Sequence, residues 1–77
     1  MPQRYIGIDV HTKSCTLAVL GPTGRRLKQW QVETDRKVLL EAVRSVAGER
    51  FICFEEGTHS DWLYEILEPL AAEIEVK

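Results

Sequence analysis

Residues 4–11 read RYIGIDVH, and this stretch decides how the rest of the chain is interpreted. Apolar Ile6, Ile8 and Val10 alternate with smaller or polar residues, and a period of two predicts a β-strand. Asp9 falls on the face of that strand opposite the isoleucines. Because a carboxylate is costly to bury unless it is paired or bound to a metal, Asp9 is the first residue that needs an explanation.

Two more strands follow the first one, each after a turn. Residues 14–20, SCTLAVL, form a second apolar strand after a tight turn at Thr12 and Lys13. Residues 21–24, GPTG, are typical of a turn, since proline presets one dihedral and glycine takes positive φ freely. Residues 25–33 alternate more weakly and predict an edge strand. The three strands should form an antiparallel meander.

The periodicity then changes to that of a helix. Thr34 or Asp35 is placed to cap a helix that runs to about Ala47, with Gly48 as its stop. Residues 51–54, FICF, are continuously apolar, which is typical of a central strand covered on both faces. Because this strand follows a helical crossover, we expect it to run parallel to the first strand and to lie beside it.

A second helix and a fifth strand complete the expected order. Thr58 should start the helix, and Asp61 is placed to return a capping-box bond. Pro69 should kink or end this helix. Residues 73–77 alternate again and predict a fifth strand. The order β-β-β-α-β-α-β is an α/β arrangement of the ribonuclease-H-like kind, in one domain over residues 1–77.

Composition and charge exclude several classes of protein. The 77 residues are 44% hydrophobic and 29% charged, which are values of an ordinary globular domain rather than of a disordered or collagen chain. No apolar run approaches the roughly 20 residues of a membrane helix. The net charge is -2, whereas a domain that binds duplex DNA by its own surface is usually basic. Any contact with DNA is therefore expected through metal ions or through other parts of a larger protein.

The two cysteines carry no recognisable pattern. Cys15 and Cys53 form neither a C-x-x-C motif nor a zinc-ligand spacing. They fall on the second and fourth strands, with the first strand between them, so no disulfide is expected. This usage favours a reduced chain with a cytoplasmic location.

Two acidic positions should converge in the predicted sheet. The fourth strand is followed by Glu55 and Glu56, and the first strand beside it carries Asp9. Two carboxylates held close together repel each other, and a divalent cation relieves that repulsion. Mg²⁺ or Mn²⁺ suits such an oxygen-only site, and two-metal sites cut or join phosphodiesters. The alternative is ordinary surface acids, since acids are also favoured at the start of a helix.

Three stretches together resemble a known family. They are YIGIDVHTKS at residues 5–14, FEEGT at residues 54–58 and WLYEILEPL at residues 62–70. In this order and spacing they are similar to the N-terminal part of insertion-sequence transposases of the IS-one-ten family, whose nuclease domain is RuvC-like and of the DEDD type. The resemblance covers essentially the whole chain.

The resemblance implies a ribonuclease-H-like fold with four acidic metal ligands in the order Asp, Glu, Asp, Asp. Asp9 matches the first ligand, and Glu55 or Glu56 matches the second. Glu55 is favoured because the family's acid directly follows the apolar strand. The loop after it is shorter than the family's Glu-x-x-Gly-Thr form, which leaves Glu56 as the alternative. The third and fourth acids belong to a later helix of the family.

For function, the resemblance implies DNA strand cleavage and transfer, that is DNA transposition and recombination, with Mg²⁺ or Mn²⁺ as cofactor. Full-length relatives also carry a C-terminal domain with a nucleophilic serine and work with a structured guide RNA. DNA and RNA are therefore the implied partners. The chain is then expected to be a truncated N-terminal fragment of a transposase. With half a metal site it should bind metal weakly and be inactive alone.

Basic residues near the turns are candidates for contact with nucleic acid. His11 and Lys13 flank the first hairpin turn, and Arg25 and Arg26 stand at the start of the third strand. Each is placed to contact backbone phosphate. The alternative for all four is a solvated turn, or an edge strand whose charge discourages pairing with other chains. Trp30 is expected to pack against the first helix rather than to stack on a base.

Two other functions stay open at this point. An ATP-binding domain of the actin or sugar-kinase group also begins with Gly-Ile-Asp and a hairpin. Here, however, the turn HTKS at residues 11–14 has no glycine to let phosphate approach closely. A non-catalytic module is the other alternative, since an exposed sheet edge and an uncovered face would favour a homodimer or larger homo-oligomer.

Overall fold

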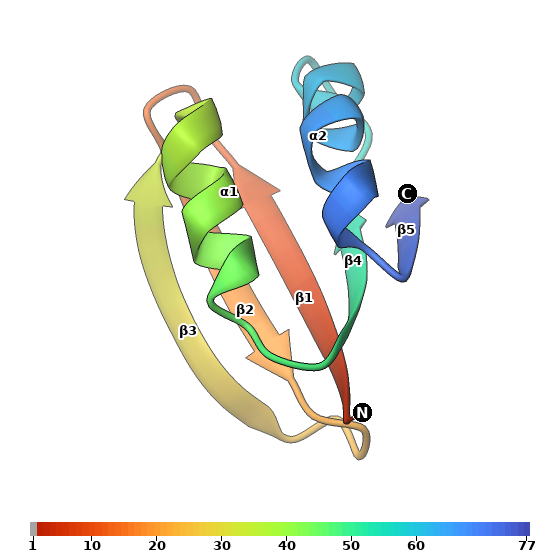
Figure 1. Cartoon of the computed structure of the whole chain (residues 1–77). Coiled ribbons are helices and arrows are strands. Elements are labelled where there is room, and N and C mark those ends of the chain that lie inside the picture. Colours follow the sequence, from red (N-terminus) through yellow and green to blue (C-terminus); the bar gives the residue numbers. More distant parts are fainter. Residues whose placement is uncertain (1) are drawn as a thin grey trace.

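The computed structural model describes residues 2–77 (Figure 1). Five segments of largely apolar or alternating residues form strands, and two amphipathic segments form helices. The chain is an α/β protein with a five-stranded mixed sheet. The predicted order β-β-β-α-β-α-β is confirmed. The elements are β1 (Gln3–Val10), β2 (Ser14–Leu20), β3 (Arg26–Glu33), α1 (Arg36–Arg44), β4 (Glu49–Phe54), α2 (Ser60–Leu67), the 3₁₀ turn η1 (Glu68–Leu70) and β5 (Glu73–Val76).

β1 is the central strand of the sheet, whose order is β3-β2-β1-β4-β5. β1, β2 and β3 are antiparallel neighbours, so the predicted meander is confirmed. β4 pairs with β1 in parallel, and β5 pairs in parallel with β4. The register places Ile8 opposite Phe54, which confirms that the first and fourth strands lie side by side.

Both helices lie on one face of the sheet (Figure 1). Alternate side chains of the strands meet the apolar stripes of α1 and α2 there. Removing this apolar surface from water is the main favourable term in folding the chain. The buried core consists of Ile6, Ile8, Cys15, Leu17, Val19, Leu39, Ala42, Val43, Val46, Ile52, Phe54, Leu63, Ile66 and Leu67.

The opposite face has no covering helix within residues 2–77, so the prediction that residues 51–54 are covered on both faces is wrong. Ile52 and Phe54 are buried, with 2% and 3% of their surface exposed, but Phe51 and Cys53 are only partly buried. Phe51 stacks on Tyr5 of β1, with ring centroids 5.2 Å apart. The connections β3–α1–β4 and β4–α2–β5 both run from the β3 edge of the sheet towards the β5 edge. Because such crossovers are right-handed, both place their helix on the same face of the sheet.

α1 begins as predicted but ends earlier. Asp35 is its N-cap, and the side chain accepts a hydrogen bond from Val38 N at 3.1 Å. The last helical residue is Arg44 rather than Ala47. Gly48 takes a φ of 98°, a left-handed conformation that glycine adopts without strain and that turns the chain into β4.

The Arg50 guanidinium explains where α1 stops. It donates to the carbonyl oxygen of Arg44 at 3.2 Å, which the helix end leaves without an internal partner, and to that of Val46 at 2.8 Å, two residues beyond the helix. It also donates to Leu70 O at 3.1 Å, at the end of η1. One side chain of β4 therefore ties together the C-terminal ends of both helical segments, where a cation suits the helix dipoles.

Replacing Arg50 with alanine is expected to lower the free energy of unfolding by about 1.5–3 kcal/mol, because hydrogen bonds from a charged donor to partly buried carbonyls are lost. Chemical denaturation followed by circular dichroism measures this change. The control is Arg36→Ala, an exposed arginine of α1, which should stay within about 0.5 kcal/mol of the parent. Equal losses in the two variants would contradict the role assigned to Arg50.

α2 begins at Ser60 rather than at Thr58, and the predicted capping box is not formed within residues 2–77. Ser60 closes a turn instead, because its Oγ donates to Gly57 O at 2.9 Å and its backbone N donates to the same oxygen at 3.1 Å. His59 therefore takes the N-cap position without a side-chain bond. The prediction for Pro69 is confirmed, since α2 ends at Leu67 and Pro69 lies in the 3₁₀ turn η1 that follows.

Gly48 has no room for a side chain. A Cβ at this position would collide with the Pro2 carbonyl oxygen, which accepts a hydrogen bond from Glu49 N at 2.9 Å. Gly48→Ala should therefore destabilise the chain by more than about 1 kcal/mol, which thermal unfolding measures. In Gly57→Ala the new Cβ would have nothing within 4 Å, so the melting temperature of this control should hold or rise slightly. Equal melting temperatures for Gly48→Ala and the parent would show that the collision is relieved at no cost.

Candidate functional site

Asp9 and Glu55 come from two neighbouring parallel strands at the middle of the sheet. The register ends at the pair Ile8 and Phe54, so Asp9 and Glu55 are the next residues on β1 and on the chain that leaves β4. Neighbouring strands lie about 4.8 Å apart, which gives the two residues adjacent positions where β1 and β4 end. The backbone register therefore places the two residues next to each other, as the predicted sheet requires.

The alternation of the strand distinguishes Glu55 from Glu56. Side chains alternate along β4, so Glu55 follows Cys53 on the uncovered face, where Asp9 also lies. Glu56 is the next residue, and it lines the same groove. The ladder continues past β4, since the backbone N and O of Lys77 bond on either side of Glu55 at 3.0 Å and 2.6 Å. Glu55 thus lies between Asp9 and Lys77 in one row across the sheet.

An open groove of about 640 Å³ runs along this end of the sheet. The two strand ends form one wall of it, and the loop from β4 to α2 forms another. Several of its residues were not singled out from the sequence, although the period of two in residues 14–20 was sufficient to place Thr16 on the face of Asp9. The polar side chains that line it are Asp9, Thr16, Gln29, Glu55, Glu56, Thr58, His59, Ser60 and Lys77.

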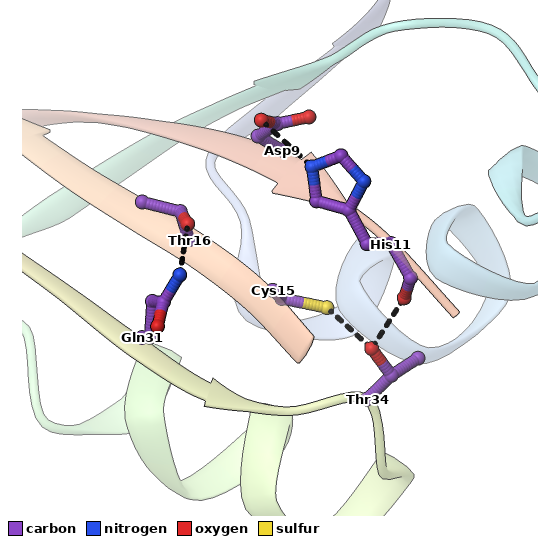
Figure 2. Close-up of polar contacts among 6 residues, drawn as sticks. All are labelled: Asp9, His11, Cys15, Thr16, Gln31 and Thr34. Carbon is purple, nitrogen blue, oxygen red and sulfur yellow. Dashed lines mark hydrogen bonds and ion pairs between the residues drawn. The ribbon is translucent and has the colours of Figure 1, made fainter. Parts of the chain in front are cut away.

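His11 lies against Asp9, as Figure 2 shows. Its Nε2 is 3.3 Å from Asp9 Oδ2, and the two side chains are 67% and 74% exposed. An exposed pair of this kind contributes little to stability. The contact places the imidazole as a second polar group beside the Asp9 carboxylate.

Thr34 holds the turn that carries His11 (Figure 2). Its Oγ1 donates to His11 O at 2.6 Å, and its backbone N donates to Lys13 O at 3.1 Å. Because the hydroxyl proton is used there, Cys15 Sγ is the donor to the same oxygen at 3.3 Å. The end of β3 is thereby fastened to the turn between β1 and β2. The helix-cap role expected of Thr34 or Asp35 belongs to Asp35.

Thr34→Val keeps the shape of the side chain and removes its hydroxyl. We expect a loss of about 1 kcal/mol in the free energy of unfolding. We also expect faster hydrogen exchange of the His11 amide, which donates to Ser14 O at 2.9 Å across the turn. NMR-detected exchange measures this. Thr12→Val, at the exposed tip of the same turn, should leave the amide's exchange rate unchanged; an unchanged rate in Thr34→Val as well would exclude the fastening role.

The four basic candidates for nucleic-acid contact do not form one surface. His11 and Lys13 lie at the β1–β2 turn, at the end of the sheet where the groove opens. Arg25 and Arg26 lie at the β2–β3 turn, at the opposite end (Figure 1). β3 is an edge strand, as predicted. Within residues 2–77, these four residues therefore provide no continuous basic track along the groove.

The remaining aromatic and sulfur side chains of interest have structural surroundings. Trp30 is partly buried and packs against the core, which includes Leu39 and Val43 of the predicted partner helix α1, and Lys28 Nζ lies 4.3 Å from the centre of its ring. Cys15 is buried among core residues and Cys53 is partly buried on the uncovered face, and both are free thiols. The His59 ring lies edge-on to Trp62, with ring centroids 6.4 Å apart.

Residues 2–77 contain no group of three or more His, Cys, Asp and Glu side chains placed to hold a metal ion. Asp9 and Glu55 supply two carboxylates. Mg²⁺ commonly binds through one or two carboxylates and keeps several waters, so this pair fits an ion completed by a substrate or by further ligands. It does not fit a closed tetrahedral zinc site.

Comparisons with known proteins give no assignment. No protein-family model matches the chain, and a search of curated proteins finds no match. Neither α1 nor α2, the helices of residues 2–77, is long and apolar enough to cross a membrane. The function is therefore argued from the site itself.

Proposed function

We propose that this chain is part of a ribonuclease-H-like, RuvC-like nuclease domain of an insertion-sequence transposase, in which Asp9 and Glu55 bind a divalent cation. The observation that carries the proposal is the pairing of β1 with β4, which gives the two carboxylates adjacent positions beside a groove. An antiparallel meander extended by parallel strands is the sheet expected of that fold. The IDVH and EEGT motifs at the two strand ends support the same assignment.

The chain's own residues have distinct roles in such a site. A divalent cation, when bound, neutralises phosphodiester oxygens and lowers the barrier to attack on phosphorus. Asp9 and Glu55 would hold it through their carboxylate oxygens, and His11 Nε2 lies beside them, 3.3 Å from Asp9 Oδ2. Thr16 and Gln29 offer a hydroxyl and an amide to sugar or base groups in the groove.

DNA is the proposed substrate, and a structured guide RNA is the proposed partner, both by family resemblance. The charge distribution supports contact through metal rather than through a basic surface. The net charge is -2, and Arg25 and Arg26 lie at the end of the sheet away from Asp9. Two carboxylates hold an ion weakly, so we expect cleavage to require further acidic ligands from outside these residues.

Thermal unfolding with and without Mg²⁺ or Mn²⁺ tests the metal site. For a Kd of about 1 mM, about 10 mM cation stabilises the folded chain by about 1.4 kcal/mol, which raises the melting temperature by roughly 6–11 °C. Asp9→Asn and Glu55→Gln should each abolish this rise. Glu56→Gln is the matched control and should retain it, because Glu55, and not Glu56, lies in the row with Asp9.

Paramagnetic broadening by Mn²⁺ gives a second readout that does not depend on stability. In NMR spectra, the amide signals around Asp9 and Glu55 should broaden at lower Mn²⁺ concentration than those of the β2–β3 turn. Broadening centred away from both carboxylates would contradict the proposal. So would a melting-temperature rise that survives in Asp9→Asn, or no response by either method up to about 20 mM cation.

A further inference from the structure

We propose that His11 is a ligand of the divalent cation that Asp9 binds, and that its ring nitrogen makes the site prefer a first-row transition-metal ion such as Mn²⁺ to Mg²⁺. This role rests on the proposed function and deepens it, because it adds a nitrogen ligand to the two carboxylates and names the class of cation. Three features of the turn after β1 support it: the separation of the two side chains, the fixed backbone of His11 and the charge around its ring.

The distance between the two side chains suits two ligands of one ion. His11 Nε2 lies 3.3 Å from Asp9 Oδ2 (Figure 2). Two ligand atoms that are each about 2.1 Å from one cation lie about 3.0 Å apart at a right angle and about 3.4 Å apart at a tetrahedral angle. A charge-assisted hydrogen bond between the same two groups is shorter, at about 2.7–2.9 Å. The separation in the structure is therefore that of two ligands around a shared ion rather than that of a tight ion pair.

The backbone that carries the two side chains is fixed by hydrogen bonds. His11 N donates to Ser14 O at 2.9 Å, and Thr34 Oγ1 donates to His11 O at 2.6 Å. Asp9 lies in the central strand β1, where it is paired with Thr16 of β2. Ligands on a fixed backbone lose little conformational freedom when an ion binds, so this turn presents the two donor atoms already close together.

The charge around the ring favours a cation over a phosphate. The side chains of His11 and Asp9 are 67% and 74% exposed, so their contact contributes little to stability. The Asp9 carboxylate makes the surroundings of Nε2 negative, which attracts a cation and repels a phosphate oxygen. The direct phosphate contact expected of His11 from the sequence is therefore less favourable than a contact made through a bound metal ion.

A ring nitrogen beside carboxylate oxygens discriminates between divalent cations. Mg²⁺ binds through oxygen ligands, whereas imidazole is a common ligand of transition-metal ions. Residues 2–77 place no third His, Cys, Asp or Glu side chain with this pair. The other coordination positions are therefore left to water, to Glu55 from the neighbouring strand and to ligands from outside these residues. His11 should add affinity for Mn²⁺ and little affinity for Mg²⁺.

The affinities of the whole chain for Mn²⁺ and Mg²⁺ test the role of His11. The EPR signal of free Mn²⁺ gives the Kd for Mn²⁺, and displacement of bound Mn²⁺ by Mg²⁺ gives the Kd for Mg²⁺. His11→Gln offers an amide oxygen in place of the ring nitrogen. It should raise the Kd for Mn²⁺ about tenfold and change the Kd for Mg²⁺ by less than about twofold. Circular dichroism checks that the variant is folded.

Pulsed EPR of bound Mn²⁺ reports the ligand itself, independently of affinity. A coordinated imidazole nitrogen modulates the electron spin echo of Mn²⁺. This modulation should be present in the parent chain and absent in His11→Gln. His59→Gln is the matched control, because His59 is the other histidine of the chain and lines the same groove. This control should keep the nitrogen modulation and the parent's Kd for Mn²⁺.

The possible outcomes distinguish the role of His11 from the proposed function. If Asp9→Asn abolishes Mn²⁺ binding while His11→Gln keeps the parent's Kd and nitrogen modulation, His11 is not a ligand and the two-carboxylate site stands. Modulation that disappears in His59→Gln instead, or equal losses of Mn²⁺ and Mg²⁺ affinity in His11→Gln, would also overturn the proposal. A parent chain that binds no Mn²⁺ up to about 20 mM would overturn both this proposal and the metal site on which it rests.

Discussion

The parallel hydrogen-bonded pairing of β1 with β4 joins the meander to the second half of the chain. Ile6 and Ile8 from one strand and Ile52 and Phe54 from the other form the middle of the buried core. α1 crosses the sheet to reach this pairing, and α2 leaves from it. The same register that buries these side chains on one face gives the two acids adjacent positions at the strand ends. Stability and candidate chemistry therefore depend on one backbone alignment.

Hydrogen bonds from two side chains connect the elements at opposite ends of the sheet, which helices cover on one face only. Thr34 ties the end of β3 to the turn beside Asp9. At the other end, Arg50 ties the C-terminal end of α1 to η1. In both cases a side chain donates to backbone carbonyl oxygens that have no partner within a helix or strand. These carbonyls lie at the ends of the elements. The apolar side chains are buried between these two ends, and the hydrogen bonds of Thr34 and Arg50 hold the elements together where the core stops.

The element order and the two acids were predictable because each rests on local periodicity or on a simple crossover rule. Alternation at residues 4–11 predicts β1, and a helix before residues 51–54 predicts β4 beside it. The separation of Arg25 from His11 was also predictable, since successive turns of a meander lie at opposite ends of the sheet.

Other features leave no local trace in the sequence. The bonds from Thr34 to His11 and from Arg50 to Leu70 join residues 23 and 20 positions apart, so no periodicity announces them. The apolar run at residues 51–54 predicts cover on both faces, yet Phe51 is apolar for a different reason, which is its stacking on Tyr5. The early end of α1 and the late start of α2 have the same origin. In both cases side chains outside the helix, or at its first residue, compete for the terminal backbone groups.

The distance along the chain between β1 and β4 has a consequence for folding kinetics. The two hairpins close short loops, whereas β4 must return across the whole meander and α1 before it pairs, at a larger loop-closure entropy. The meander by itself contains Asp9 and His11 but not Glu55. The proposed two-carboxylate site would therefore require the β1–β4 pairing, and the meander alone would offer a divalent cation a single carboxylate.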